Sequence, residues 1–344
     1  MLAADQLDEG LALCQALGGY WLSQGFLVEA EQWLARFLEH ADRVHWATLA
    51  DSLHVAGRIA EYRGAYALAQ SQHLRSLNIS REHGDATRAA RALCGIAAAE
   101  IHQAEYAPAQ QHLQEALAFA RRSESLPELA QALLALGRIA DLQGDTARAG
   151  VYRDECLQIH RQLGDEWGIA YVLNELGQQA RREGRLERAQ TMLEECLILW
   201  RKSGSRMGER SALMNLAAVT FERGLLARSA TLARESIDVC RDLADASATT
   251  ARCLEIASQV IYALAPAETA VSLIAAAAAQ REALGAPVPP QEQTEIERTL
   301  SASRASLNEQ VFQQAWQRGE HLTAPQALEL AAASLAQFVE SPVV

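Results

Sequence analysis

Large apolar residues recur with a period of 39 or 40 residues along most of the chain. One column contains Leu53, Leu93, Leu133, Leu173 and Leu213, and another contains Leu38, Leu77, Leu117, Leu157, Leu197 and Ile237. The residues around them are mainly Ala, Leu, Glu, Gln and Arg, which favour helix, and no run of alternating β-branched residues predicts a strand. The pattern therefore predicts an all-α protein built from a repeated unit.

Small residues follow the same period and divide each unit into two helices. The four columns are Gly18, Gly57, Ala97, Gly137, Gly177, Ala217 and Ala257; Gly25, Gly64, Ala104, Gly144, Gly184 and Gly224; Ala30, Ala69, Ala109, Ala149, Ala189, Ser229 and Thr269; and Phe37, Ser76, Ala116, Cys156, Cys196, Ser236 and Ala276. Glycine inside a helix costs about 1 kcal/mol relative to alanine, so the first column predicts close approach by a neighbouring helix. The second column lies between two helical stretches, where glycine can adopt positive φ in a tight turn. Each unit is thus predicted to be an antiparallel helical hairpin.

Capping residues mark the boundaries between units. Asp85, Asp165 and Ser205 each follow a glycine, and this order suits a helix C-terminus followed by the next N-cap. Ser125 and Asp245 occupy the same register without the glycine, and Ser125 with Glu128 fits a capping box. The spacing predicts helices of about 17 residues, each about 25 Å long.

Seven such hairpins bury their apolar faces only on one another, which predicts a solenoid. The columns resemble the tetratricopeptide repeat (TPR) over residues 10–285: Leu-Gly in the first helix, Gly at the turn, and Ala followed by a small residue in the second. The resemblance implies an all-α, right-handed α-solenoid of about seven TPR-like hairpins with a C-terminal helical cap. The chain departs from the family in its period of 40 instead of 34 and in its Ala and Leu at family aromatic positions. HEAT-like solenoids, whose period is also near 40, are the alternative.

A proline-rich stretch at 285–290 ends the periodicity, and helical patterns follow at 291–305, 307–318 and 325–338. We therefore expect a repeat domain over 1–285 and a capping segment over 286–344. The tail, with Phe312 and Trp316 at Phe-x-x-x-Trp spacing and a Gly-x-x-Leu-Thr motif, resembles the segment that closes the helical-repeat region of bacterial LuxR-type and related signalling ATPases. That resemblance implies a sensor region, either excised from a larger regulator or free-standing. No G-x-x-x-x-G-K-[ST] motif is present, so we expect no ATPase in this sequence.

Charge and composition narrow the class of protein. The formal net charge is −12, and the arginines are dispersed without a basic stripe, so we expect no direct binding of nucleic acid by this chain. No basic, apolar leader opens the sequence, and its longest apolar run is too short to span a bilayer, so we expect a cytoplasmic protein with no membrane contact. The six cysteines form no Cys-x-x-Cys pair and are predicted to be reduced and buried.

No motif for catalysis is present, and we predict a protein that is not an enzyme and carries no cofactor. His54 and Cys94 occupy equivalent positions on successive first helices, with His102 two turns beyond Cys94, but they lack the spacing typical of a zinc site. We therefore predict no metal. Trp167 and Trp200 are expected to pack between neighbouring repeats or to line a pocket.

The resemblance to TPR proteins implies that the first helix of each hairpin lines a concave groove. Polar residues fill the corresponding columns in the second to fifth repeats, and the candidate ligand-binding residues are His54, Arg58, Arg138, Tyr171, Asn174, Gln178 and Arg181. Arginine grips carboxylate or phosphate at two points, so we expect a protein or peptide, or a small anionic effector, in the groove. The alternative is that the carboxylates of Asp51, Glu61 and Asp141 pair with these arginines.

The same columns become apolar in the last two repeats, at Met214, Phe221, Leu254 and Ile261. An exposed apolar patch marks a contact surface, so we expect the tail to fold onto it with Phe312 and Trp316 among its anchors. The leading hypothesis is a ligand- or protein-sensing module of a bacterial regulator. The alternative is a free-standing scaffold that assembles protein partners through an open groove.

Overall fold

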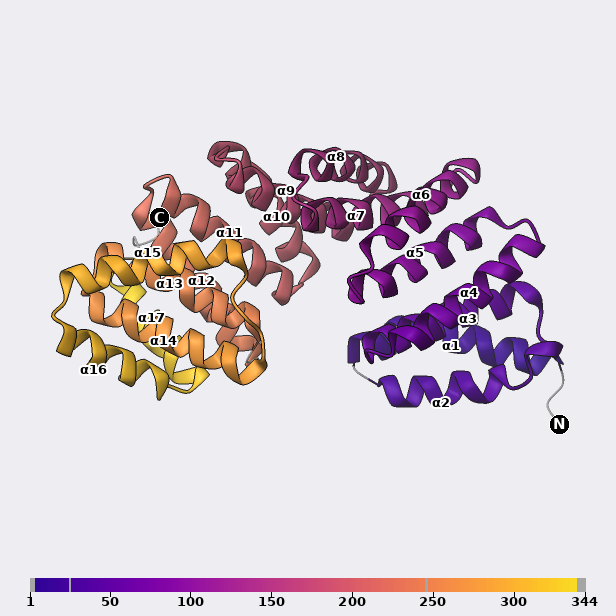
Figure 1. The fold of residues 1–344 in the computed structure, drawn as a ribbon, viewed down its shortest axis with the longest axis horizontal. Helices are drawn as coiled ribbons and strands as arrows, with labels where there is room; N and C mark the ends of the chain where they lie inside the picture. The colour runs from indigo at the N-terminus through magenta and orange to yellow at the C-terminus, as the bar shows by residue number, and fades with distance from the viewer. Residues whose placement is uncertain (1–3, 25, 245–246, 339–344) are drawn as a thin grey trace. The chain divides into compact units, whose positions relative to one another are not determined.

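Helices and tight turns alternate with a 20-residue period in the computed structural model, which describes residues 4–24, 26–244 and 247–338. Consecutive helices form antiparallel hairpins (Figure 1). The seven hairpins in these ranges are α1 (Ala4–Gln24) with α2 (Leu27–Leu38), α3 (Trp46–Tyr62) with α4 (Tyr66–Glu82), α5 (Ala86–His102) with α6 (Tyr106–Arg122), α7 (Leu126–Leu142) with α8 (Thr146–Leu163), α9 (Glu166–Arg182) with α10 (Leu186–Ser203), α11 (Arg206–Glu222) with α12 (Leu226–Leu243), and α13 (Ala248–Leu264) with α14 (Ala267–Leu284). The predicted all-α hairpin fold is confirmed.

The hairpins belong to two compact units. The first four form the unit of residues 1–165, and the last three, together with the tail, form the unit of residues 166–344. Within the first unit, α3 packs on α5 and α5 packs on α7, so equivalent positions of successive first helices are neighbours. The predicted boundary at residue 285 coincides with the end of α14 at Leu284, and the assignment of 1–285 and 286–344 as domains stays a prediction. No helix in the described ranges is long and apolar enough to cross a bilayer.

A residue with left-handed backbone follows each helix from α3 to α12. Positive φ recurs every 20 residues, at Gly64, Gly84, Ala104, Glu124, Gly144, Gly164, Gly184, Gly204, Gly224 and Ala244. A Cβ added at Gly144 would meet no atom within 4 Å, so its φ of 80° is what requires glycine there. The predicted turn column is confirmed over this range, whereas Gly25 lies outside the described residues.

The predicted caps are confirmed in part. Asp85 accepts a hydrogen bond from the Arg88 backbone N–H at 2.9 Å, and the Ser205 hydroxyl accepts one from a backbone N–H of α11 at 3.3 Å. The capping box at Ser125 is wrong: its hydroxyl donates to the Glu128 carboxylate, and no cap hydrogen bond forms. Glu128 also binds the Arg91 guanidinium, which holds the carboxylate away from the helix N-terminus. Asp245 lies outside the described residues.

Close approach at Gly57 and Gly177, which lie inside first helices, comes from side chains of the second helices, whereas at Gly18 it comes from Val55 of the next first helix. The His73 imidazole of α4 is fully buried against Gly57, where an added Cβ would lie 2.5 Å from the ring. Leu193 of α10 fills the equivalent space at Gly177, 2.6 Å from an added Cβ. At Gly137 the nearest atom would be 3.5 Å away, which is ordinary contact. The predicted crowding is therefore confirmed at Gly57 and Gly177 and is wrong at Gly137.

Three tail helices, α15 (Pro290–Ser306), α16 (Glu309–Glu320) and α17 (Ala324–Ala336), cover the last two hairpins (Figure 1). Phe312 of α16 is buried in an apolar cluster with Val271 of α14, and Trp316 packs at the edge of this cluster. The helix α17 packs on α12, α13 and α14. The tail folds onto this end as predicted.

The anchoring surface differs from the predicted one. Phe312 and Trp316 pack on α14, the second helix of its hairpin, whereas the predicted apolar columns belong to the first helices α11 and α13. Among those columns, Leu254 and Ile261 are fully buried. The tail helix α15 reaches the first helices α9 and α13 through the Glu295 carboxylate, which pairs there with Arg181 and Arg252.

Candidate ligand-binding surface

Two arginines in the first unit are exposed and unpaired. Arg58 of α3 and Arg138 of α7 form no ion pair and no side-chain hydrogen bond with any residue that the structure describes. They occupy the same position of their repeats, two repeats apart, with Ala98 of α5 at the intervening position. Two unneutralised guanidinium groups thus stand in one column of the first-helix surface.

The neighbouring carboxylates are engaged elsewhere. Asp51 pairs with Arg88 at 2.9 Å and with Arg91 at 3.4 Å. The Glu61 carboxylate pairs with the His73 ring nitrogen at 3.0 Å and with no arginine among the described residues. The carboxylate of Asp141 pairs with a guanidinium of α8. These acids therefore leave Arg58 and Arg138 available to an anion.

His54 lies next to Arg58 in a positive environment. Its ring centroid is 5.0 Å from that of His73, and its Nδ1 is buried without a hydrogen-bond partner among the described residues. Burial first, and then the positive charges of His73, Arg58 and Arg91, lower the pKa of His54 well below its usual value. The imidazole is therefore neutral at pH 7 and offers one donor and one acceptor.

The other groups considered for chemistry are packed into the repeats. All six cysteines are buried and free, as predicted. Burial, with a smaller effect of Glu128, raises the pKa of Cys94 to about 12, so its thiol is protonated. The His102 ring stacks on Tyr66 with centroids 5.0 Å apart. The described residues contain no cluster of three or more His, Cys, Asp or Glu side chains able to hold a metal ion.

Aromatic side chains gather near the start of α9 in the second unit. Tyr171 stacks on Trp167 with centroids 5.6 Å apart, and Trp167 meets Trp200 edge to face at 5.5 Å. Trp200 is buried against Gly208 of the next hairpin, so the prediction of packing between repeats is confirmed for this residue. Trp167 is 58% exposed and, with Tyr171, forms an accessible aromatic surface.

The remaining candidates in the second unit are less accessible. Asn174 accepts a hydrogen bond from Asn215 at 2.9 Å, and Gln178 is half-buried. Arg181 pairs with Glu222 at 2.8 Å and with Glu295 of the tail helix α15. The Arg181 guanidinium is therefore already bound by carboxylates of the same chain.

A buried ion network fixes α15 and was not foreseen from the sequence. Arg281 binds Glu255 at 2.6 Å and Glu292 at 3.0 Å, and Arg252 binds Glu295 at 2.6 Å. Arg252 occupies a column that is small or apolar in every other repeat. Its counterparts are Leu13, Ser52, Ala92, Ala132, Val172 and Ala212. The charged Arg252 in this otherwise small or apolar column was the feature of the sequence that could have indicated a carboxylate partner outside the repeats.

A series of helical hairpins with a left-handed residue at their turns defines the chain as an α-solenoid of the TPR kind. No protein-family profile matches the sequence, and no curated protein matches it. Solved structures with the same fold do match, and the three described below are distant in sequence. A signal transduction ATPase (STAND) protein with a TPR sensor, PH0952 from Pyrococcus horikoshii, aligns with a TM-score of 0.62 and 15% identity over 90% of this chain and 50% of that one.

Two further structures match along most of their own length. The apo form of the quorum sensor NprR from B. thuringiensis aligns with a TM-score of 0.59 and 12% identity, over 94% of this chain and 87% of that one. BtubC from P. vanneervenii aligns with a TM-score of 0.55 and 18% identity, over 68% of this chain and 92% of that one. At these identities the similarity shows the fold alone. It confirms the predicted TPR resemblance and fits the resemblance to STAND-type helical-repeat regions.

Proposed function

We propose that the chain is a non-enzymatic binding module that recognises an acidic peptide or an acidic segment of a protein on the first-helix surface of the first unit. The observation that carries this proposal is the pair Arg58 and Arg138, which are exposed and without a carboxylate partner among the described residues. Other arginines of the repeats, such as Arg88 and Arg91, are neutralised within the chain. An unpaired guanidinium binds a carboxylate at two points with charge-assisted hydrogen bonds.

The spacing of the two arginines favours a peptide over a small anion. Adjacent packed helices lie 8–10 Å apart, so equivalent positions two repeats apart are separated by roughly 20 Å. An extended chain advances about 3.3 Å per residue, so two carboxylates about six residues apart span this distance. A small anionic effector reaches one arginine at a time.

Electrostatics support the same class of ligand. The chain carries a formal net charge of −12, yet His54 has positive neighbours: burial first, and then the charges of His73, Arg58 and Arg91, lower its pKa. A local positive patch on an acidic protein orients an acidic ligand toward that patch. The neutral imidazole adds a directional donor and acceptor beside Arg58.

More specifically, we propose that this binding module is the cytoplasmic sensor module of a bacterial regulator. It is supported by two fold neighbours whose names describe a TPR sensor and a quorum sensor. The alternative is a free-standing scaffold, which would hold a long segment of a folded partner rather than a short peptide. Peptide length therefore separates the two: a sensor ligand binds fully as a short peptide, whereas a scaffold partner gains affinity with each added repeat contact.

The test is selection of displayed acidic peptides on the full chain, followed by affinity measurement with two matched variants. Arg58→Glu/Arg138→Glu reverses the candidate charges, and Arg75→Glu/Arg122→Glu makes the same change of net charge on the second helices α4 and α6. We expect at least tenfold weaker binding by the first variant and little change by the second. Equal affinity for all three proteins, or equal loss in both variants, contradicts the proposal. Peptides with carboxylates two residues apart should bind more weakly than those with carboxylates six apart.

A further inference from the structure

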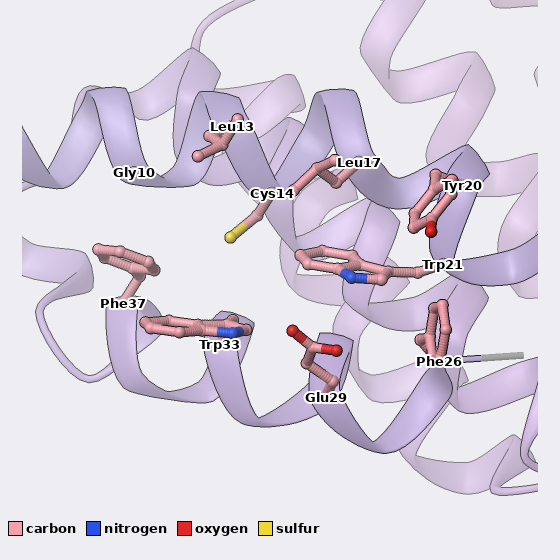
Figure 2. Close-up of a pocket in the computed structure, with 10 residues that line it drawn as sticks. All are labelled: Gly10, Leu13, Cys14, Leu17, Tyr20, Trp21, Phe26, Glu29, Trp33 and Phe37. Atoms are coloured by element: carbon pink, nitrogen blue, oxygen red, sulfur yellow. The ribbon is translucent and has the colours of Figure 1, made fainter. Parts of the chain in front are cut away.

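The N-terminal hairpin exposes an apolar groove between α1 and α2 (Figure 2). Its volume is about 430 Å³, and its lining is mainly aromatic and aliphatic, with the Glu29 carboxylate between Trp33 and Phe26. Leu13 and Tyr20 at its edge are 60% and 54% exposed. An apolar surface of this kind on a soluble protein marks a contact site.

The repeat shows what such a surface does elsewhere in the chain. The counterparts of Leu13 and Tyr20 in all later hairpins are buried. They are Ser52, Ala92, Ala132, Val172, Ala212 and Arg252 in one column and Ile59, Ala99, Ile139, Gln179, Val219 and Gln259 in the other. The exposure of Leu13 and Tyr20 is therefore an exception to the rule of the repeat.

The preceding hairpin is what covers these positions. The Ser52 hydroxyl of α3 accepts a hydrogen bond from Gln15 of α1 at 2.8 Å, and Ile59 packs in a cluster with Leu11 and Trp21. Leu13 and Tyr20 thus lie on the face that takes a further helical hairpin. A repeat whose outer face binds no other element is polar on that face, whereas this face of α1 and α2 is apolar.

The opposite end of the repeats is closed. Phe312 of α16 is buried against α14, and α17 packs on α12, α13 and α14. Every residue from 250 to 261 of α13 is buried. Head-to-tail stacking of chains therefore lacks one of the two faces it needs, whereas a two-fold contact uses the same face twice.

We propose that two copies of this chain associate through the α1/α2 face about a two-fold axis. Charges on α2 support a second copy as the occupant. Glu29 lies in the groove, and the Arg36 guanidinium, about two turns away, lies over the Trp33 ring at 5.4 Å from its centroid. When two α2 helices run antiparallel, each Glu29 faces Arg36 of the partner subunit. The groove carboxylate of each of the two subunits is then neutralised by one arginine.

The first experiment is analytical ultracentrifugation of the full chain over a range of concentrations. We expect a dimer, and we expect Leu13→Glu/Tyr20→Glu to weaken the association at least a hundredfold. Val151→Glu/Ile198→Glu, at positions 65% and 66% exposed on α8 and α10, is the matched control and should remain dimeric. A monomeric wild type, or an unchanged dimer in the α1 variant, overturns the proposal.

A charge exchange tests the two-fold pairing without touching the apolar positions. Glu29→Arg and Arg36→Glu should each dissociate when alone, because like charges then face each other across the axis. An equimolar mixture of the two variants restores both pairs and should form a heterodimer. If both proteins are folded by circular dichroism and their mixture does not associate, the proposed geometry is contradicted. This test remains informative even if the Leu13→Glu/Tyr20→Glu variant does not fold.

Discussion

The Glu295 carboxylate of α15 pairs with Arg181 of α9, which lies 114 residues earlier in the chain, and also accepts a hydrogen bond from Arg252 of α13 at 2.6 Å. One tail side chain thereby holds the first helices of two different hairpins. The pair also explains why Arg181, although it is one of the candidate ligand-binding residues, differs from Arg58 and Arg138. Any external anion at Arg181 must compete with a carboxylate that is already in place.

Replacing Glu295 with glutamine should destabilise the protein. Arg181 and Arg252 would each lose one of the carboxylates that compensate them, and both guanidinium groups are largely buried, with 15% and 7% side-chain exposure. We expect a loss of about 2 kcal/mol in the free energy of unfolding. Urea denaturation followed by circular dichroism measures it, with hydrogen exchange showing whether the loss is concentrated in α15.

Glu292→Gln, one turn away on the same helix, should behave in the opposite way. Burial first, and then the charges of Glu255 and Glu295, raise the pKa of Glu292 despite the opposing effect of Arg252 and Arg281. A raised carboxyl pKa means that the ionised form is disfavoured in the folded state. The neutral amide still accepts from Arg281, so we expect unchanged or slightly higher stability at pH 7. A loss as large as that of Glu295→Gln would show that Glu292 is a net stabilising charge.

The two glutamates predict opposite dependences on pH. Burial opposes ionisation of Glu295, but Arg181 and Arg252 outweigh it and lower its pKa. Its contribution is therefore present above the unfolded value of about 4.3 and is lost as the pH falls through the lower folded value. For Glu292 the folded pKa is the higher one, so its cost is present at neutral pH and disappears as the pH falls toward about 4.3. The free energies of unfolding of the wild type and both variants, measured from pH 7 to pH 3, should therefore differ most at pH 7 and converge as the pH falls.

Two glycines of one sequence column should respond differently to alanine. At Gly177 the new Cβ would lie 2.6 Å from Leu193, which is fully buried, so we expect a loss of about 1–3 kcal/mol from overpacking. At Gly137 the nearest atom is 3.5 Å away, so the higher helix propensity of alanine should prevail, with a gain of up to about 1 kcal/mol. Thermal denaturation of both variants checks the sign, and equal losses would show that the two sites are equally crowded.

The fold was largely predictable because its constraints repeat. Each small residue in a column meets the same geometric need in every hairpin, so a pattern such as Gly64, Gly144 and Gly224 predicts the turn without any knowledge of the surroundings. The exceptions are positions where one particular neighbour decides. Ser125 and Glu128 fit a capping box by sequence, but Arg91 of the preceding hairpin binds the Glu128 carboxylate, and the capping box does not form.

The candidate surface was predictable only as a set of columns. Sequence position places Arg58 and Arg138 in one column of the first helices and Arg181 in another, but it does not show which of them has a carboxylate within reach. Asp51 and Glu61 pair with residues outside the candidate set, and the partner of Arg181 comes from a helix beyond the repeats. Such contacts between distant segments leave no periodic signal, which is why the tail anchors were predicted on the wrong helices.

Turns that use left-handed backbone without glycine are sites where the protein is strained. Ala104 has φ of 61° at the position where Gly144 has φ of 80° one repeat later. Left-handed backbone costs a non-glycine residue about 1–2 kcal/mol, and the extra freedom of glycine in the unfolded chain offsets part of the gain.

We therefore expect Ala104→Gly to raise the free energy of unfolding by about 0.5–1 kcal/mol and Gly144→Ala to lower it by a similar amount. No heavy atom lies within 4 Å of an added Cβ at Gly144, so the effect of alanine there is one of backbone conformation and not of packing. Urea denaturation of both single variants and of the double variant measures the two effects. Since the two turns belong to different hairpins, the changes should add in the double variant to nearly zero. A destabilised Ala104→Gly would mean that the alanine methyl contributes more through packing than its backbone costs.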